Sequence, residues 1–260
     1  MKKGIIFVAI LVNLIFGVQG FSEATSKYSD KEIEKVLEEY NKGNKQKAMS
    51  VLKENILKNP SDLKLKVFLG MMYEDMDKKK EAEKELNEVV ELQKKYPFIG
   101  DDGKKYDIRL IIGNLYASEK EYEKALKWYK EIDDKYMKDV IGLKEYMIGV
   151  SNYALKNPEE AKKYFLKSYI SDKEGNSEDF LGQIYYEEGN HKEALKWYLK
   201  SIEKGNPDTY SSLGIFYSSL GDNAKALQWF RKALEEVKKE KDAEGIKAIQ
   251  EIIKDIESKN

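Results

Sequence analysis

The feature that most constrains how this sequence can fold is a short motif that recurs along the chain. The segments "KALKWYKEID" (124–133), "EALKWYLKSIEKGNP" (193–207) and "KALQWFRKALEE" (225–236) each place a tryptophan three residues after an alanine. They contain all the tryptophans of a chain in which 36% of residues are charged. Residues three apart share one face of a helix, so this phrase predicts a helix that packs within a repeated unit.

Alignment on this alanine gives six copies at intervals of about 34 residues. The repeat alanines are Ala48, Ala82, Ala125, Ala161, Ala194 and Ala226. Twelve residues before each alanine, in every copy except the first, stands a glycine: Gly70, Gly113, Gly149, Gly182 and Gly214. A period of this length indicates supersecondary units that stack, because one unit alone cannot bury its hydrophobic face.

Each copy is predicted to form two helices joined by a turn. In the fifth copy, apolar residues recur at helical spacing over 180–185 and again over 194–201, and "EEGN" (187–190) separates them. We expect Gly182 and Ala194 to face each other, so that two helix backbones approach closely. The large aromatic side chains then fill the space toward the next unit. The alternative for the tryptophans is an exposed, ligand-binding position.

The first helices resemble those of the tetratricopeptide repeat family. The matching runs are "FLGMMY" (68–73), "IIGNLY" (111–116), "FLGQIY" (180–185) and "SLGIFY" (212–217). The stretch "EALKWYLKSIEKGNPDTYSSLG" (193–214) also resembles the related Sel1-like repeats. The resemblance implies an all-α fold: a right-handed α-solenoid of about six helix-turn-helix repeats with a C-terminal capping helix. It specifies the fold far more closely than the function.

The predicted domain organisation is a signal peptide (1–20), a linker (21–30), a solenoid (31–241) and a capping helix (242–258). The units of the solenoid are 29–62, 63–96, 106–139, 142–174, 175–206 and 207–240. The segment "PFIGDDGKK" (97–105) falls outside the period. We expect a plain turn there, with a hinge as the alternative, because the further carboxylates of a calcium loop are missing.

The N-terminus is typical of a secretory signal. Two lysines precede an apolar run over 4–18, and small residues follow, with cleavage expected after Gly20 or Ala24. A retained membrane anchor is the alternative, although crossing a bilayer takes about 20 apolar residues. The sequence therefore predicts export, to the periplasm or to the cell surface or medium of a bacterium.

Composition argues against several classes of function. Lys and Arg number 46 against 47 Asp and Glu, so there is no basic excess of the kind that binds nucleic acid. The chain has no cysteine and a single histidine, His191, in a predicted turn, which leaves few nucleophile–base pairs or transition-metal sites. We predict that the protein is not an enzyme and has no cofactor and no bound metal. Contact with a membrane is expected only through an uncleaved N-terminal segment.

The resemblance also implies where a partner binds. In this family the first helix of each pair lines a concave groove that holds a peptide segment of a partner. Carried over through the matched glycine and tyrosine positions, the groove residues here are Asn114, Ser118, Tyr146, Val150, Tyr153, Asp179, Gln183, Tyr186, Ser211, Ile215 and Ser219. Tyr153 and Tyr186 alternatively pack between units.

Some members of the family grip a terminal carboxylate with lysines, arginine and asparagines at fixed groove positions. Here Leu110 and Val150 replace a lysine and an asparagine of that set, so this mode is disfavoured. The predicted groove is rich in tyrosine and neutral to acidic. It should suit a neutral or basic, partly apolar segment of another protein.

The leading hypothesis is an exported, non-catalytic scaffold that binds a partner's peptide segment in this groove. Two alternatives remain. In the first alternative, the chain self-associates through its C-terminal helix and acts as a structural or spacer protein of the cell envelope. In the second, it is an enzyme or a small-ligand receptor with a deep pocket of converging carboxylates.

Overall fold

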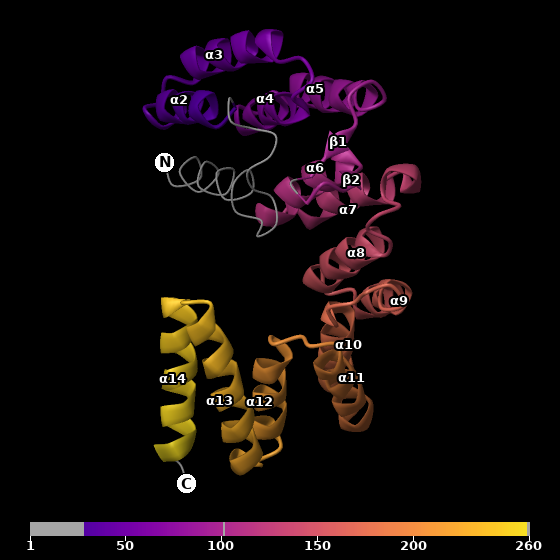
Figure 1. Ribbon diagram of the computed structural model, residues 1–260, viewed down its shortest axis with the longest axis vertical. Coiled ribbons are helices and arrows are strands. Elements are labelled where there is room, and N and C mark those ends of the chain that lie inside the picture. The colour runs from indigo at the N-terminus through magenta and orange to yellow at the C-terminus, as the bar shows by residue number, and fades with distance from the viewer. Residues whose placement is uncertain (1–28, 101, 259–260) are drawn as a thin grey trace. The chain divides into compact units, whose positions relative to one another are not determined.

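The computed structural model describes residues 29–100 and 102–258. These residues contain thirteen α-helices, α2 to α14, and one short pair of strands (Figure 1). They form two compact units, divided between Lys144 and Glu145. The predicted signal peptide (1–20) and all of the predicted linker except residues 29 and 30 lie outside the described residues.

The first unit contains three helix pairs. Its elements are α2 (Ser29–Asn41), α3 (Lys45–Lys58), α4 (Leu63–Asp75), α5 (Lys79–Leu92), β1 (Phe98–Ile99), β2 (Lys105–Tyr106), α6 (Ile108–Ser118) and α7 (Tyr122–Lys130). Each first helix packs against the helix that follows it: α2 on α3, α4 on α5, and α6 on α7. Side-chain caps start two of the first helices, since Asp62 accepts from the Lys64 amide and Asp107 from the Arg109 amide.

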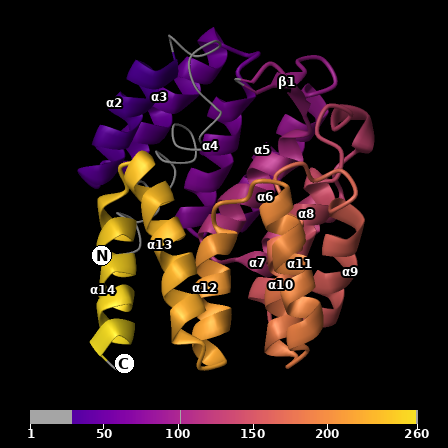
Figure 2. The same ribbon diagram turned by 60° about the horizontal axis from the view of Figure 1, so that its bottom comes forward.

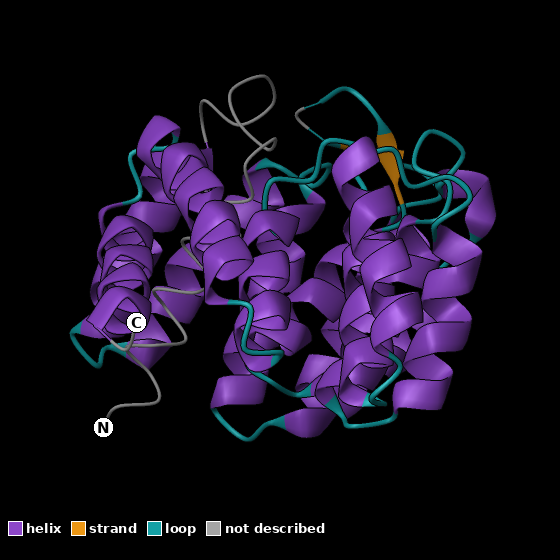
Figure 3. Ribbon diagram, turned by 90° about the horizontal axis from the view of Figure 1, so that it is seen from below, coloured by secondary structure: helices purple, strands orange, loops and turns teal. Residues whose placement is uncertain are grey.

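The segment 97–105, expected to be a plain turn, instead contributes to a β-hairpin (Figure 3). Phe98 pairs with Tyr106 in an antiparallel register, and both side chains are buried. Gly103 adopts a φ of +75°, which lets the chain reverse at low steric cost. Two-residue strands are too short to show an alternating pattern, so sequence periodicity does not detect this hairpin.

The second unit continues the pairing. Its elements are α8 (Leu143–Ala154), which begins at the division, α9 (Pro158–Ser168), α10 (Asn176–Glu187), α11 (His191–Glu203), α12 (Thr209–Ser219), α13 (Asn223–Lys239) and α14 (Ala243–Ser258). Figure 2 shows α12, α13 and α14 side by side. Ile249 and Ile256 of α14 are buried against Phe230 and Ala233 of α13, so α14 covers the last pair. The all-α class and the consecutive helix pairs of an α-solenoid are confirmed.

The repeat glycines make room for one particular side chain. A Cβ placed on Gly182 would lie 2.5 Å from Cδ1 of Tyr198, and one on Gly214 would lie 2.7 Å from Cε1 of Phe230. The other three glycines face Leu86, Tyr129 and Phe165 in the same way. Each partner stands four residues after the repeat alanine. At Gly182 the nearest atoms belong to the Tyr198 ring, four residues after Ala194, so the missing Cβ makes room for this ring.

The tryptophans of the second unit join one helix pair to another. Trp197 of α11 packs in a cluster with Ala161 and Phe165 of α9, and its ring lies 5.4 Å from the Tyr169 ring. Trp229 of α13 packs against the cluster that contains residues of α11 and stacks on Tyr210 at 5.9 Å. The structural interpretation of these rings is confirmed, but they fill space toward the preceding pair, whereas the sequence analysis placed them toward the next one.

We predict that Gly182→Ala lowers the free energy of unfolding by about 2 kcal/mol, because the new methyl group overlaps the Tyr198 ring. Urea unfolding measures the change. The adjacent Gln183→Ala is the control and should change stability by less than about 0.5 kcal/mol.

A double-mutant cycle identifies the contact responsible. In a Tyr198→Ala background, Gly182→Ala should lower the free energy of unfolding only slightly, because the ring that the new methyl group would overlap is absent. An equal cost of Gly182→Ala in both backgrounds would show that the ring is not the obstacle.

Candidate functional site

Nine of the eleven predicted groove residues lie on α8, α10 and α12, the first helices of the second unit. We call this set the first-helix face: Tyr146, Val150, Tyr153, Asp179, Gln183, Tyr186, Ser211, Ile215 and Ser219. The other two, Asn114 and Ser118, lie on α6 in the first unit. Asn114 Oδ1 accepts a 2.7 Å hydrogen bond from the Tyr129 hydroxyl, and the Ser118 hydroxyl donates to the Leu115 carbonyl.

The tyrosines of α8 pack on the side chains of the pair that follows. Tyr146 and Tyr153 lie 6.0 Å and 5.5 Å from the Phe180 ring of α10, in edge-to-face arrangements. Phe180 itself stacks on Phe165 of α9 at 4.8 Å. The Tyr153 hydroxyl donates to the carboxylate of Glu187, which is exposed. The Tyr153 ring thus packs between helix pairs, as the alternative proposed, while its polar end remains at the surface.

The Tyr186 ring of α10 likewise packs between helix pairs, against α12. This ring lies 5.9 Å from Phe216 of α12 and 5.9 Å from His191, and it is half-buried. The exposed His191 is therefore a neighbour of the first-helix face, at the turn between α10 and α11. A half-buried tyrosine at each junction gives this face rigid contact area with a polar tip.

Asp179 is the most unusual group on this face. Its Oδ2 accepts a 3.3 Å hydrogen bond from the Ser212 hydroxyl of α12, but its Oδ1 is buried and makes no hydrogen bond within the described residues. Burial raises the pKa of the Asp179 carboxyl, and hydrogen bonding by Thr209 and Ser212 only partly opposes this. Ionisation of this carboxyl is therefore less favourable in the folded chain than in the unfolded chain.

Carboxylates gather around Tyr146. Burial raises the pKa of the Tyr146 hydroxyl, and the negative charges of its acidic neighbours raise it further. These neighbours are Asp172, Asp179, Asp208 and Glu174. They stand at or near the N-terminal ends of α10 and α12, so this part of the first-helix face carries a negative potential.

The remaining predicted residues do not converge on one point. Ile215 is 54% exposed, the Ser219 hydroxyl donates to the Phe216 carbonyl, and Gln183 Nε2 lies 3.5 Å from Oε1 of Glu187. Val150 packs on the core of the unit. The structure thus brings Tyr153 to Glu187, a residue that the sequence analysis missed, and places Asp179 near Tyr146. Tyr186 lies at the next junction, against Phe216.

Sequence analysis also missed a buried ion pair beside this face. Glu178 is 1% exposed and pairs with Lys204. The Lys204 ammonium also donates to the carbonyls of Tyr169 and Asp172, at 3.0 Å and 2.6 Å, and so ties the α9–α10 loop to the end of α11. Lysine and glutamate are so frequent in this chain that no local pattern marks this pair.

Across residues 29–100 and 102–258, no cluster of three or more His, Asp or Glu side chains could hold a metal ion. In the same part of the chain, none of the helices combines the length and the apolar character needed to cross a bilayer. The groups that the first-helix face presents are ring faces, hydroxyl tips and carboxylates.

Three segments match models of a known repeat family. Residues 63–96 and 180–203 match one tetratricopeptide repeat model, and residues 209–244 match another. Each of these three segments is similar to a tetratricopeptide repeat. They coincide with α4–α5, with most of α10–α11, and with α12–α13. The matched segments of the second unit therefore include Tyr186 of α10 and all of α12, while Asp179 stands one residue before the first of them.

Several solved structures resemble the chain. They include pilF of Pseudomonas aeruginosa (17% identity over 85% of this chain and 96% of that one, TM-score 0.46). A tetratricopeptide repeat protein from Parabacteroides merdae shows 20% identity over 87% of this chain and 96% of that one, with a TM-score of 0.48. YrrB, described as a TPR protein with an unusual peptide-binding site, shows 18% identity over 77% and 97%, with a TM-score of 0.44. Comparison with curated proteins gives no match.

We predict that Asp179→Asn raises the free energy of unfolding at pH 7 by about 1 kcal/mol, because it removes a buried charge and keeps the side-chain shape. A carboxyl with a raised pKa contributes its full stability below the unfolded pKa, about 3.9, and loses that contribution as pH rises through the folded pKa. The advantage of asparagine should therefore shrink as pH falls toward 4.

Urea unfolding at a series of pH values measures this difference. Asp208→Asn is the matched control: this exposed carboxylate also lies near Tyr146, and its substitution should change stability by less than about 0.5 kcal/mol. A loss of stability in Asp179→Asn at pH 7 would contradict the assignment of a buried, costly charge.

Proposed function

We propose that this chain is an exported, non-catalytic scaffold whose first-helix face binds a peptide segment of a partner protein. Tetratricopeptide repeats typically bind proteins or peptides and are usually not catalytic, and three segments of the chain match this family. The observation that carries the proposal is Asp179, whose buried Oδ1 makes no hydrogen bond within the described residues, on a face lined by half-buried tyrosines. Groups that destabilise a fold are commonly retained for function.

The chemistry of the face defines the kind of partner. Tyr146, Tyr153 and Tyr186 offer rigid apolar area with hydroxyl tips, which favours apolar or aliphatic contact at a low entropic cost. The carboxylates around Tyr146 favour a positive charge. We therefore propose a partly apolar segment that carries lysine or arginine.

Export is the second element of the proposal. It is supported by the sequence of residues 1–24 alone, with its two lysines, apolar run and small residues. We also propose that the repeats from α11 onward have Sel1-like character, on the basis of the pattern in 193–214. Under this proposal the scaffold acts in the periplasm or at the cell surface of a bacterium.

The binding proposal predicts that the chain without residues 1–20 recovers a partner from an envelope extract, and that Tyr153→Ala combined with Tyr186→Ala abolishes recovery. The double substitution removes both ring contacts and both hydroxyl tips from the first-helix face. Pull-down with quantitative mass spectrometry measures the loss for each recovered protein.

The matched control replaces two half-buried tyrosines elsewhere, Tyr136→Ala and Tyr164→Ala, and should leave recovery unchanged. Equal stability of the test and control variants in urea separates loss of binding from loss of folding. Recovery that survives the Tyr153/Tyr186 substitutions would exclude the first-helix face as the binding surface.

The export proposal predicts that the protein purified from the envelope fraction begins at Phe21 or at Thr25, following cleavage after Gly20 or Ala24. N-terminal sequencing and intact mass measure this directly. An N-terminus at Met1 in a membrane fraction would instead show that the segment is retained as an anchor.

A further inference from the structure

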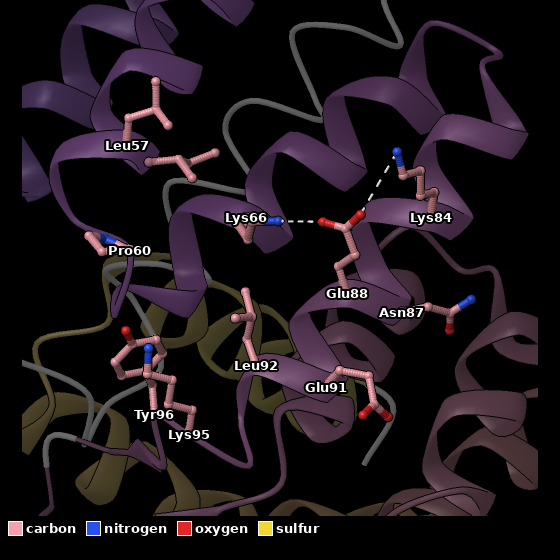
Figure 4. A pocket seen from close by; sticks show the side chains of 11 residues that line it. Leu57, Pro60, Lys66, Lys84, Asn87, Glu88, Glu91, Leu92, Lys95 and Tyr96 are labelled. Carbon is pink, nitrogen blue, oxygen red and sulfur yellow. Dashed lines mark hydrogen bonds and ion pairs between the residues drawn. The ribbon is translucent and has the colours of Figure 1, made fainter.

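The first unit contains a cavity that has no residue in common with the predicted groove. It lies between the C-terminal parts of α3 and α5, and Lys66 of α4 reaches its interior (Figure 4). Its volume is about 950 Å³. Leu57 and Pro60 line one side, and Leu92 and Tyr96 line the other (Figure 4). We call it the α3–α5 pocket.

The exposure of Leu57 is the first observation that suggests a binding partner for this pocket. The Leu57 side chain is 82% exposed at the pocket, although leucine gains most when it is buried. Leu57 stands nine residues after its repeat alanine, and the equivalent positions in the other five copies are Glu91, Asp134, Ile170, Glu203 and Glu235. Since four of the six are acidic, stacking of the repeats does not require an apolar side chain there.

The charges of the pocket are unevenly neutralised. Glu88 accepts from Lys66 at 2.8 Å and lies 3.9 Å from Lys84, so two ammonium groups share this carboxylate (Figure 4). Glu91, at the rim, pairs with Lys94. Lys95 has no carboxylate partner among the described residues, and its ammonium lies 4.9 Å from the Tyr96 ring centroid. A positive charge without a carboxylate partner therefore stands beside the apolar walls.

We propose that the α3–α5 pocket docks a peptide segment of a partner protein that carries an aliphatic side chain and a nearby carboxylate. The aliphatic side chain packs between Leu57 and Leu92, and the carboxylate binds the Lys95 ammonium. This surface differs from the first-helix face in its charge preference: it selects acidic segments, while the first-helix face suits basic ones. The proposal does not depend on the function proposed above.

The experiment selects ligands without a prior choice of sequence. A random peptide-display library is selected on the full chain and counter-selected on the Leu57→Ser variant, so that only peptides that need Leu57 survive. We expect the enriched peptides to combine Leu, Ile or Met with Asp or Glu within a few residues. A synthetic peptide of the most enriched sequence then serves as the probe in fluorescence anisotropy.

Three variants test the assigned roles. Leu57→Ser should weaken binding of the probe by about tenfold, as expected for loss of an apolar anchor. Lys95→Glu should weaken binding of the acidic probe by a similar factor. The same substitution should strengthen binding of a second peptide in which lysine replaces the acidic residue of the probe. The control Ile170→Ser removes an equally prominent apolar side chain, 78% exposed at the same repeat position in the second unit, and should leave binding unchanged. Leu57 and Ile170 are both exposed, so both variants should retain the unfolding transition of the parent chain.

Other results overturn the proposal. Enrichment of basic peptides, or no enrichment that depends on Leu57, excludes a docking surface of this chemistry. A dimer in light scattering that Leu57→Ser dissociates assigns the pocket to a second copy of the chain. Probe binding that appears only after removal of residues 1–20 assigns it to the chain's own N-terminal segment.

Discussion

The contact between a first-helix glycine and a second-helix side chain underlies every helix pair except α2–α3. At Gly182 and Gly214 the partner is a large aromatic ring, and at Gly70 it is Leu86. With no Cβ on the first helix, the ring lies directly on its backbone, and the two helices pack at a distance that a larger residue would prevent. The glycine costs helix propensity, about 1 kcal/mol relative to alanine, and the close packing offsets this loss. Since the chain has no cysteine, such packing replaces covalent cross-links.

The contacts between one helix pair and the next are made by other side chains. Trp197 and Trp229 extend from second helices back to the preceding pair, while Tyr153 and Tyr186 lie on first helices at the junction with the following pair. Trp197 is buried in this role, with 7% of its surface exposed, and Trp229 is half-buried. The tyrosines remain half-exposed, which leaves their hydroxyls on the surface. Junction packing and surface chemistry are therefore coupled on the first-helix face.

The sequence predicted the parts of the structure that repeat. Six copies of an alanine followed four residues later by a large apolar or aromatic side chain specified the helix pairs, because each pair packs in the same way. Features that occur once were missed. The hairpin at Phe98–Tyr106 is too short for a periodic signal, and the Glu178–Lys204 pair depends on two residue types that are abundant everywhere in the chain. The direction of Trp197 was predicted wrongly, since spacing fixes the face of a helix but not which neighbour lies on it.

In a repeat protein, the residues that differ between copies carry more information about function than the residues that all copies share. A side chain that every copy shares explains stacking, so it says little about a partner. Asp179 and Leu57 are informative because repeat packing does not explain them fully. Asp179 is a half-buried carboxylate with one buried oxygen that makes no hydrogen bond within the described residues, and Leu57 is an exposed leucine at a position that is acidic in four copies. They lie in different units and differ in chemistry. Each departs from what packing alone would select, and the partners proposed for the two surfaces would supply the energetic reason for keeping them.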